Sequence, residues 1–455
     1  MKYISTRGQA PTAGFADVLL AGLASDGGLY VTESWPTLPR DWARPRPYAE
    51  RAAEVIWPYV DGSFDRTALD AMVAAAYQVF DHPEVCPLVE LSPGLYVMEL
   101  FHGPTLAFKD VALQLVGRMF DAELTRRGER ATIVVATSGD TGSAAIAACV
   151  GRPTLDIVVL HPAGRVSDVQ RRQMTTVDAP NVFNVAVEGT FDDCQDLVKG
   201  LFADAALRDR LRLSAMNSIN WARIAAQIVY YVAAAAQLGR CALAVPTGNF
   251  GNILAGWIAR RSGAPIERLA IGSNRNDVLT RWVQTGALVA EGVVPTLSPS
   301  MDIQVSSNHE RLLFELSGRD GAATAQWMGR FRQLGAVEVP VDPVFAAASL
   351  DDAATLEQIA AVHRDTGYLV DPHTAVGIGA ARSLGMVDVA ADLPVVCLAT
   401  AHPAKFPDAV EQATGIRPSL PEHLGDLFDR PERYEVLPAD LAAIGAYANA
   451  CVGAR

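Results

Sequence analysis

The stretch Thr132-Ile-Val-Val-Ala-Thr-Ser-Gly-Asp-Thr-Gly-Ser-Ala-Ala-Ile-Ala-Ala-Cys149 decides the fold class of this chain. Its first five residues form a short apolar run, which predicts a buried strand. Small polar residues and glycines then predict a loop, and the Ala-rich residues 143–149 predict a helix. A strand followed by a tight loop and a helix is the unit of α/β folds, whose parallel sheets are covered by helices on both faces.

The same order of strand, loop and helix recurs along the rest of the chain. Further strands are predicted at residues 156–160, 182–187, 241–245, 269–271 and 395–399, and helices at 219–238 and 253–261. The first 90 residues differ, because amphipathic segments near 16–23 and 66–79 predict a mainly helical region that ends near Pro83 and Pro87. We therefore predict an α/β fold with mainly parallel sheets, in which ligands bind at the carboxyl ends of the strands.

The length, cysteine content and charge of the chain exclude several classes of protein. A chain of 455 residues is too long for one core, so two or three domains are expected. Six cysteines are scattered without a CxxC pair or metal-like pairing with histidine, and residues 1–8 lack the apolar segment of a signal peptide. We expect reduced thiols, a cytoplasmic location and no metal site. No run reaches the roughly eighteen apolar residues of a membrane span, and a net charge of -13 argues against nucleic-acid binding.

A lysine stands at a predicted helix start in His102-Gly-Pro-Thr-Leu-Ala-Phe-Lys-Asp110. Gly103 and Pro104 predict a loop, and apolar residues at helical spacing from position 112 onward place the helix start near Lys109. The positive end of the helix dipole and the apolar surroundings both favour the neutral amine, which attacks a carbonyl to make a Schiff base. For an isolated motif of this kind, a solvated lysine in a first helical turn is the more common arrangement.

Two glycine-containing loops follow predicted strands. In Ala136-Thr-Ser-Gly-Asp-Thr-Gly-Ser143 the backbone N–H groups suit a carboxylate or a phosphate, and a capped helix start explains the same residues equally well. In Pro246-Thr-Gly-Asn-Phe-Gly-Asn252 two glycines let the backbone approach an anion, with a turn and helix cap as the alternative. The second loop is not a P-loop, and the G-x-G-x-x-G of dinucleotide folds is absent, so a compact phosphate is favoured over a nucleotide.

A third loop, Leu398-Ala-Thr-Ala-His-Pro-Ala-Lys-Phe406, also follows a predicted strand. Thr400 leaves a buried strand with a hydroxyl that needs a partner, which is ordinarily main chain, and His402 and Lys405 are more often loop formers than ligands. With Lys109, the three loops provide an amine for a Schiff base, a cup for a phosphate, a hydroxyl for a ring nitrogen and a binding loop for a carboxylate. This combination describes a pyridoxal-phosphate site.

The chain resembles the threonine synthases, which are fold-type II pyridoxal-phosphate enzymes related to the tryptophan synthase β-subunit. The stretches that carry the resemblance are Tyr3-Ile-Ser-Thr-Arg-Gly8, Ala24-Ser-Asp-Gly-Gly-Leu-Tyr30, His102 to Asp110, Ala136 to Gly142, Asn217-Ser-Ile-Asn-Trp-Ala-Arg223, Pro246 to Asn252, Leu297-Ser-Pro-Ser-Met-Asp-Ile-Gln-Val-Ser-Ser-Asn308, Asp371-Pro-His-Thr-Ala-Val-Gly377 and Ala399 to Phe406. The N-terminal segment resembles that of the longer, bacterial and fungal type. The resemblance implies two open, mainly parallel twisted sheets, with an N-terminal region at 1–90, a large cofactor-binding domain at 91–128 and 222–455, and a small domain at 129–221.

The resemblance also implies roles for individual residues. Lys109 carries the Schiff base and later moves protons. The cofactor phosphate is wrapped by Gly248, Asn249, Phe250, Gly251 and Asn252, and Thr400 meets the pyridine nitrogen. The substrate α-carboxylate is held by Thr137, Ser138 and Thr141. Asp140 stands where related enzymes often have Asn, and a carboxylate beside the cofactor's phenolic oxygen is electrostatically unfavourable, so Asp140 is left without a role.

The implied activity is the conversion of O-phospho-L-homoserine and water to L-threonine and phosphate, by γ-elimination and then β-addition of water, the last step of threonine biosynthesis. The substrate phosphate is assigned first to Arg165 and second to Arg223, with Asn217 as a further contact and a surface or capping role as the alternative for each arginine. A related phospho-lyase would share the cofactor site, and a non-catalytic binding protein would be expected to lack Lys109 or the phosphate loop. We expect a small-molecule substrate, no nucleic acid or membrane partner, and a monomer or homodimer.

Overall fold

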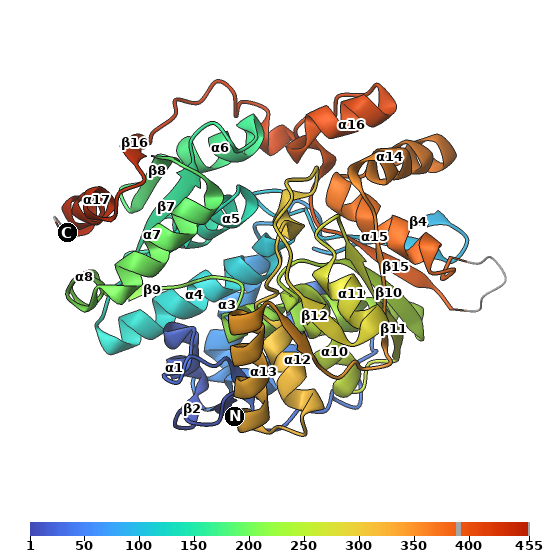
Figure 1. Ribbon diagram of the computed structural model, residues 1–455, viewed down its shortest axis with the longest axis horizontal. Helices are drawn as coiled ribbons and strands as arrows, with labels where there is room; N and C mark the ends of the chain where they lie inside the picture. The colour runs from blue at the N-terminus through green and yellow to red at the C-terminus, as the bar shows by residue number, and fades with distance from the viewer. Residues whose placement is uncertain (388–392, 454–455) are drawn as a thin grey trace.

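The computed structural model describes residues 1–387 and 393–453, which fold around two separate β-sheets (Figure 1). The larger sheet has six strands in the order β14 (Phe345–Ser349), β11 (Ile266–Ser273), β10 (Cys241–Pro246), β15 (Val395–Ala399), β5 (Leu95–Glu99) and β4 (Leu88–Ser92). The strands pair in parallel except for β4, which is antiparallel to β5 at the edge. The α/β class with mainly parallel sheets is thereby confirmed.

The smaller sheet has five parallel strands. Their order is β16 (Glu435–Pro438), β8 (Val182–Glu188), β7 (Leu155–Pro162), β6 (Ala131–Ala136) and β9 (Leu213–Ser214). The edge strand β16 comes from the end of the chain, and the helix after it, α17 (Leu441–Gly453), lies beside α7 (Phe191–Ala203) (Figure 1). We therefore propose that residues 435–453 belong with 129–221 in the small domain.

Helices cover both faces of each sheet because successive strand residues point to opposite sides. In β10, Leu243 and Val245 pack into the core beneath α4 (Lys109–Arg127), α9 (Trp221–Leu238) and α10 (Gly251–Arg261). Ala242 and Ala244 alternate with them and pack against the other layer of helices. That layer consists of α14 (Asp352–Thr366) and α15 (Pro372–Ser383). The remaining helices outside the N-terminal region are α5 (Asp140–Cys149), α6 (Asp168–Thr175), α8 (Ala205–Leu211), α11 (Val278–Thr285), α12 (His309–Leu316), α13 (Gly321–Leu334) and α16 (Pro407–Thr414).

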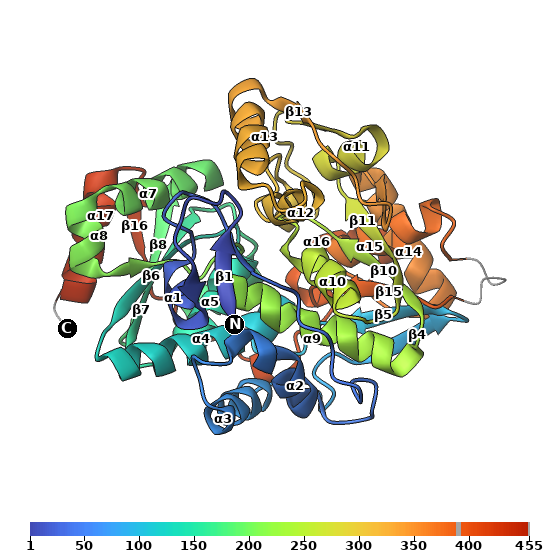
Figure 2. The ribbon, with the colours of Figure 1, turned by 90° about the horizontal axis from the view of Figure 1, so that it is seen from below.

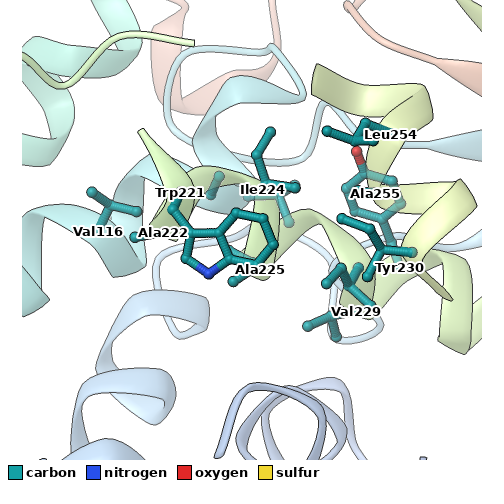
Figure 3. Close-up of a cluster of buried hydrophobic side chains, with 14 of the residues drawn as sticks. Val116, Trp221, Ala222, Ile224, Ala225, Val229, Tyr230, Leu254 and Ala255 are labelled. Atoms are coloured by element: carbon teal, nitrogen blue, oxygen red, sulfur yellow. The ribbon is translucent and has the colours of Figure 1, made fainter. Parts of the chain in front are cut away.

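The buried helix α9 joins the parts of the molecule, because it contacts α4, α10 and the N-terminal α2. Figure 3 shows Trp221, Ile224 and Ala225 on α9 with Val116 of α4 beside them and Leu254 of α10 farther along. These side chains are almost fully buried, so α9 holds α4 and α10 relative to each other.

The N-terminal region packs on α4 and α9, on the side away from the large sheet's α14 and α15 (Figure 2). It contains β1 (Lys2–Ser5), β2 (Ala13–Gly14), α1 (Phe15–Ala21), β3 (Tyr30–Thr32), α2 (Tyr48–Val60) and α3 (Arg66–Tyr77). The three strands form a small antiparallel sheet in the order β2-β1-β3. A two-stranded antiparallel ribbon is formed by β12 (Ala287–Val289) and β13 (Ala336–Glu338), and β13 lies next to α13 at the top of Figure 2.

Candidate active site

Lys109 is the first residue of α4, and the loop before it is tied to the loop that carries Thr400. The N–H of Phe108 donates to the carbonyl oxygen of Thr400 at 2.9 Å, and Ala107 pairs with Ala401 in an isolated bridge. Lys109 and Thr400 therefore both lie at the carboxyl ends of β5 and β15, although they are 291 positions apart in sequence. Both residues are buried.

A buried carboxylate next to Lys109 holds this loop in shape. Asp110 accepts from the N–H and the hydroxyl of Thr105 at 2.8 and 2.7 Å. Burial raises the pKa of Asp110 to about 6, against the lowering effect of those two hydrogen bonds. Gly103 packs on the same carboxylate so closely that a Cβ there would lie 2.6 Å from its Oδ2. Asp110 was not among the predicted site residues, and its place beside Lys109 in the loop motif is the signal that points to it.

The ammonium of Lys109 contacts the carboxylate of Asp140, the first residue of α5. Lys109 Nζ lies 3.1 Å from Asp140 Oδ2 and 4.9 Å from the centre of the Phe108 ring. The other oxygen, Oδ1, lies 2.9 Å from Nζ of Lys405 and accepts from Nε2 of Gln170 at 2.8 Å. Asp140 is therefore a central acceptor of the site, and Lys405, which its sequence context led us to expect as a loop former, is a second buried cation beside it.

Burial and charge act in opposite directions on the Lys109–Asp140 pair. Burial lowers the pKa of Lys109, and the positive charges of Lys405 and Arg223 lower it further, while Asp140 raises it. Burial alone would raise the pKa of Asp140, but Lys109, Lys405 and His373 together hold it well below its ordinary value. Asp140 is thus ionised at neutral pH, and Lys109 is easier to deprotonate than an exposed lysine.

The predicted phosphate loop forms the turn between β10 and α10. Phe250 has a φ of 63°, in the left-handed region, which turns the chain sharply into the helix. Ser306 Oγ donates to the carbonyl of Gly248 at 2.7 Å, and Asn308 Nδ2 donates to that of Asn249 at 3.0 Å. Because C=O and N–H point in opposite directions across a trans peptide, the N–H groups of Asn249 and Phe250 point to the other side of the turn.

Three features of this loop fit a bound phosphate. A Cβ on Gly248 would lie 2.7 Å from the carbonyl oxygen of Ser300, so only glycine lets the backbone pass here. The amide nitrogen Nδ2 of Asn252 is buried and has no hydrogen-bond partner among residues 1–387 and 393–453. The N-terminus of α10 adds its positive dipole to these donors. Buried donors without acceptors beside a helix N-terminus are what an anion requires.

The loop after β6 uses its first hydroxyl for its own structure. Thr137 Oγ1 accepts from the N–H groups of Gly139 and Gly142, both at 2.9 Å, as a helix cap does. Ser138 and Thr141 are partly exposed on the same turn, next to Asp140. The N-cap of α5 is Gly139, so neither Thr141 nor Ser143 caps the helix, while the predicted contact of Thr137, Ser138 and Thr141 with a substrate carboxylate stays a prediction.

The residues predicted to hold the substrate phosphate lie in different surroundings. Arg165 is exposed in the loop between β7 and α6. Asn217 is partly buried, and its Oδ1 accepts from the N–H of Ile219 at 3.3 Å. Arg223 is buried on α9, where burial lowers its pKa to about 10. Its Nε lacks a hydrogen-bond partner among the described residues, and its Nη1 makes one long hydrogen bond of 3.4 Å to the carbonyl of Met216.

Comparison with known proteins agrees with this geometry. The family model described as pyridoxal-phosphate dependent enzyme matches residues 79–401, so the fold and the site define a pyridoxal-phosphate-dependent enzyme. The models described as threonine synthase N terminus and threonine synthase, C-terminal match residues 2–77 and 374–447. The chain belongs to the threonine synthase family, and its activity is the pyridoxal-phosphate-dependent formation of threonine.

The relatives match over nearly their full length. Threonine synthase of Pseudomonas aeruginosa is 51% identical, with 99% of this chain and 98% of the relative covered. Threonine synthase of Saccharomyces cerevisiae is 39% identical, with 90% of this chain and 88% of the relative covered. The crystal structure of PLP-bound threonine synthase from Brucella melitensis superposes with a TM-score of 0.95 at 49% identity, covering 99% of each chain. Processed threonine deaminase isoform 2 from Solanum lycopersicum, at 15% identity and a TM-score of 0.52, shares the fold alone.

Proposed function

We propose that this chain converts O-phospho-L-homoserine and water to L-threonine and phosphate at the site centred on Lys109. The observation that carries the proposal is the buried ammonium of Lys109, which lies 3.1 Å from Asp140. The positive charges of Lys405 and Arg223 also act on this ammonium. A buried amine with a lowered pKa is suited both to covalent bonding with an aldehyde and to proton transfer.

Pyridoxal phosphate fits the residues present. When bound, it supplies an aldehyde that bonds to amines and an electron-withdrawing ring that stabilises negative charge on the substrate's carbon atoms. Lys109 would hold its aldehyde carbon, and the 248–252 loop would hold its phosphate through backbone N–H groups and Asn252. Thr400 would meet the ring nitrogen with a neutral hydroxyl, which leaves that nitrogen largely unprotonated.

Lys109 and Asp140 have different roles in proton transfer. Lys109 Nζ would take a proton from a substrate carbon and return one later, because its lowered pKa makes the neutral amine accessible. Asp140, ionised and within hydrogen-bond distance of Nζ, would stabilise the ammonium each time Lys109 holds the proton.

Two anionic groups of the substrate need binding residues. Ser138 and Thr141, together with the backbone of the turn that Thr137 caps, would hold the α-carboxylate. The departing phosphate would be stabilised by Arg223, which is buried without a carboxylate partner among the described residues, and by the exposed Arg165 and the partly buried Asn217.

The decisive experiment combines a spectrum with an assay of products. The purified protein should absorb in the near-visible range that a cofactor on Lys109 produces, and O-phospho-L-homoserine should be converted to threonine and phosphate in equal amounts. Release of 2-oxobutyrate in place of threonine would identify a phospho-lyase instead. A protein with neither the absorbance nor phosphate release would refute the assignment to Lys109.

We also propose a cytoplasmic location and no nucleic-acid partner, with a monomer or homodimer as the assembly. The free thiols of the structure, five of six buried, suit a reducing compartment, and the net charge of -13 opposes polyanion binding. Among the helices described, none is long and apolar enough to cross a membrane.

A further inference from the structure

Lys405 is a buried lysine whose charge lies on the same carboxylate as that of Lys109. It is fully buried in the short 3-10 helix η2 (Pro403–Lys405), where it donates to the carbonyl of Thr105 at 2.6 Å. Its Nζ lies 2.9 Å from Asp140 Oδ1, while Lys109 takes Oδ2. One carboxylate therefore balances two ammonium groups, and the trio carries a net positive charge when all three are ionised.

The chain uses lysine sparingly, which makes this position informative. It contains 34 arginines and 4 lysines, so arginine supplies almost every cation. Lys2 and Lys199 are exposed, and the other two lysines both contact Asp140. Lysine presents a compact ammonium whose pKa shifts readily on burial, whereas the guanidinium of arginine stays charged. The use of lysine twice at one carboxylate indicates a requirement for a small, buried point charge.

The contact also crosses between the two sheets. Asp140 stands at the start of α5, which packs on the small sheet, and Lys405 follows β15 of the large sheet. The carbonyl of Lys405 accepts from Ser167 Oγ at 3.3 Å, beside α6 of the small sheet. Lys405 therefore holds Asp140 in place from the side of the molecule that also carries Lys109.

We propose that Lys405 is a positioning residue that acts through Asp140. Its ammonium keeps the Asp140 carboxylate ionised and balances the negative charge, so that Lys109 can release its proton and take it back. The inference rests on the proposed function of Lys109. Without Lys405, Lys109 would be the main counter-charge of a buried carboxylate, and its deprotonation would leave that charge unpaired. Lys405 removes this penalty, since Asp140 keeps one cation whichever state Lys109 adopts.

The other groups facing the pair do not replace Lys405. Arg223 adds a further positive charge on the Lys109 side. Gln170 and Ser300 offer neutral donors to Asp140. His373 also lowers the pKa of Asp140, but its ring nitrogens are engaged by other groups, Nε2 by the N–H of Ser300 and Nδ1 by Asp371. Lys405 is thus the cation that contacts Asp140 besides Lys109 in the described part of the chain.

The test uses Lys405→Met, Asp140→Asn, the double variant, and Lys199→Met as a surface control. The full-length chain, freed of cofactor, is treated with cyanate at a series of pH values, and carbamylation of Lys109 is measured by peptide mass spectrometry. Because cyanate reacts with neutral amines, Lys405→Met should slow labelling of Lys109 at pH 7 by roughly tenfold, and Asp140→Asn should speed it by a similar factor. The double variant should return to within about threefold of wild type, because it removes both opposing charges. Lys199→Met should match wild type.

The pH midpoint of labelling should accordingly be highest in Lys405→Met and lowest in Asp140→Asn, with wild type and the double variant between them. A loss of folding explains none of these opposite shifts, and circular dichroism identifies any variant that has unfolded. The proposal is overturned if the double variant behaves like Lys405→Met, or if Lys405→Met leaves the midpoint unchanged. It is also overturned if that variant only raises KM for the phospho-substrate, which would make Lys405 a substrate ligand. Failure of the proposed function is distinct, since it would appear as wild-type protein that makes no threonine.

Discussion

Arg223 offers a test in which stability and ligand binding should change in opposite directions. Its guanidinium is buried, its Nε has no partner among the described residues, and the hydrogen bond from its Nη1 to the carbonyl of Met216 is long, at 3.4 Å. We predict that Arg223→Met, which keeps an unbranched chain and removes the charge, stabilises the cofactor-free protein and weakens its binding of phosphate groups. A residue kept for stability would not show this combination.

The stability term follows from the pKa of Arg223, which burial lowers from the ordinary value of arginine to about 10. A shift of that size corresponds to about 3 kcal/mol of destabilisation when the group is charged. Because the lowered pKa disfavours the charged form, this cost is fully present below about pH 10 and disappears as the pH rises through the ordinary pKa of arginine. The shorter methionine gives up about 1 kcal/mol of packing, so we expect a net gain of about 2 kcal/mol at pH 7.

The assay is thermal melting of the cofactor-free chain, with and without inorganic phosphate or O-phospho-L-homoserine. A gain of about 2 kcal/mol should raise the melting temperature by about 2–4 °C in a protein of this size. Losing charge-assisted hydrogen bonds of about 2 kcal/mol should weaken phosphate binding roughly thirtyfold. The ligand-induced rise in melting temperature should therefore shrink in the variant.

Arg311→Met is the matched control, because Arg311 is equally buried but well bonded. Burial lowers its pKa to about 9, yet its guanidinium donates to the carbonyls of Tyr30 and Ile219, at 2.9 and 2.7 Å, and to Asn308 Oδ1. Removing it leaves three acceptors unpaired, so the melting temperature should fall. If Arg223→Met also lowers the melting temperature and leaves the effect of phosphate intact, then Arg223 is structural and the reasoning is refuted.

The remaining predictions concern the cofactor and pH. Lys109→Ala should abolish both the near-visible absorbance and turnover while the far-ultraviolet circular dichroism stays native; a variant that keeps either would contradict the role of Lys109. Gly248→Ala places a Cβ 2.7 Å from the carbonyl of Ser300 and should weaken cofactor binding at least about tenfold in a fluorescence titration, whereas Gly14→Ala, with open space around it, should not. Burial lowers the pKa of His102, but its contacts with two carboxylates outweigh this and raise it. The two carboxylates therefore stabilise the folded protein when His102 is protonated. This stabilisation is complete below about pH 6.5 and is lost as the pH rises through the raised pKa of His102. The substitution His102→Gln should accordingly lower the melting temperature more at pH 6 than at pH 9.

Local sequence patterns predict much of this fold because apolar runs and helix boundaries depend on neighbouring residues. The helix at Lys109 starts where the loop and the apolar spacing place it, and β6, β7, β10 and β15 coincide with the predicted strands. The edge strand β16 was not predicted. Its residues are mostly exposed, and what makes it a strand is pairing with β8, 250 positions earlier. Such pairing depends on the tertiary structure rather than on local sequence.

The same distinction applies to the site. Lys109, Thr400 and the phosphate loop stand at strand ends, and the order of α/β units brings those ends together, so their proximity could be predicted. The role of Lys405 could not, because a lysine in a Pro-containing loop is ordinarily solvated. Only the structure reveals that its ammonium is buried on Asp140. That contact also resolves the electrostatic difficulty of Asp140, since a carboxylate between two ammonium groups does not present a net negative charge to a cofactor.

The charges around Asp140 explain how an acidic chain can bind two phosphorylated molecules. Lys109, Lys405 and Arg223 bring three positive charges against the two carboxylates of Asp140 and Asp110, whereas the whole chain carries -13. Charges more than about 10 Å away are largely screened at physiological ionic strength. A unit charge 4 Å away in a partly buried site acts with about 4 kcal/mol. The buried cations therefore determine the electric field at the site. The cofactor-free protein holds their excess positive charge at a cost in stability. A doubly charged phosphate that enters the site would neutralise this excess positive charge.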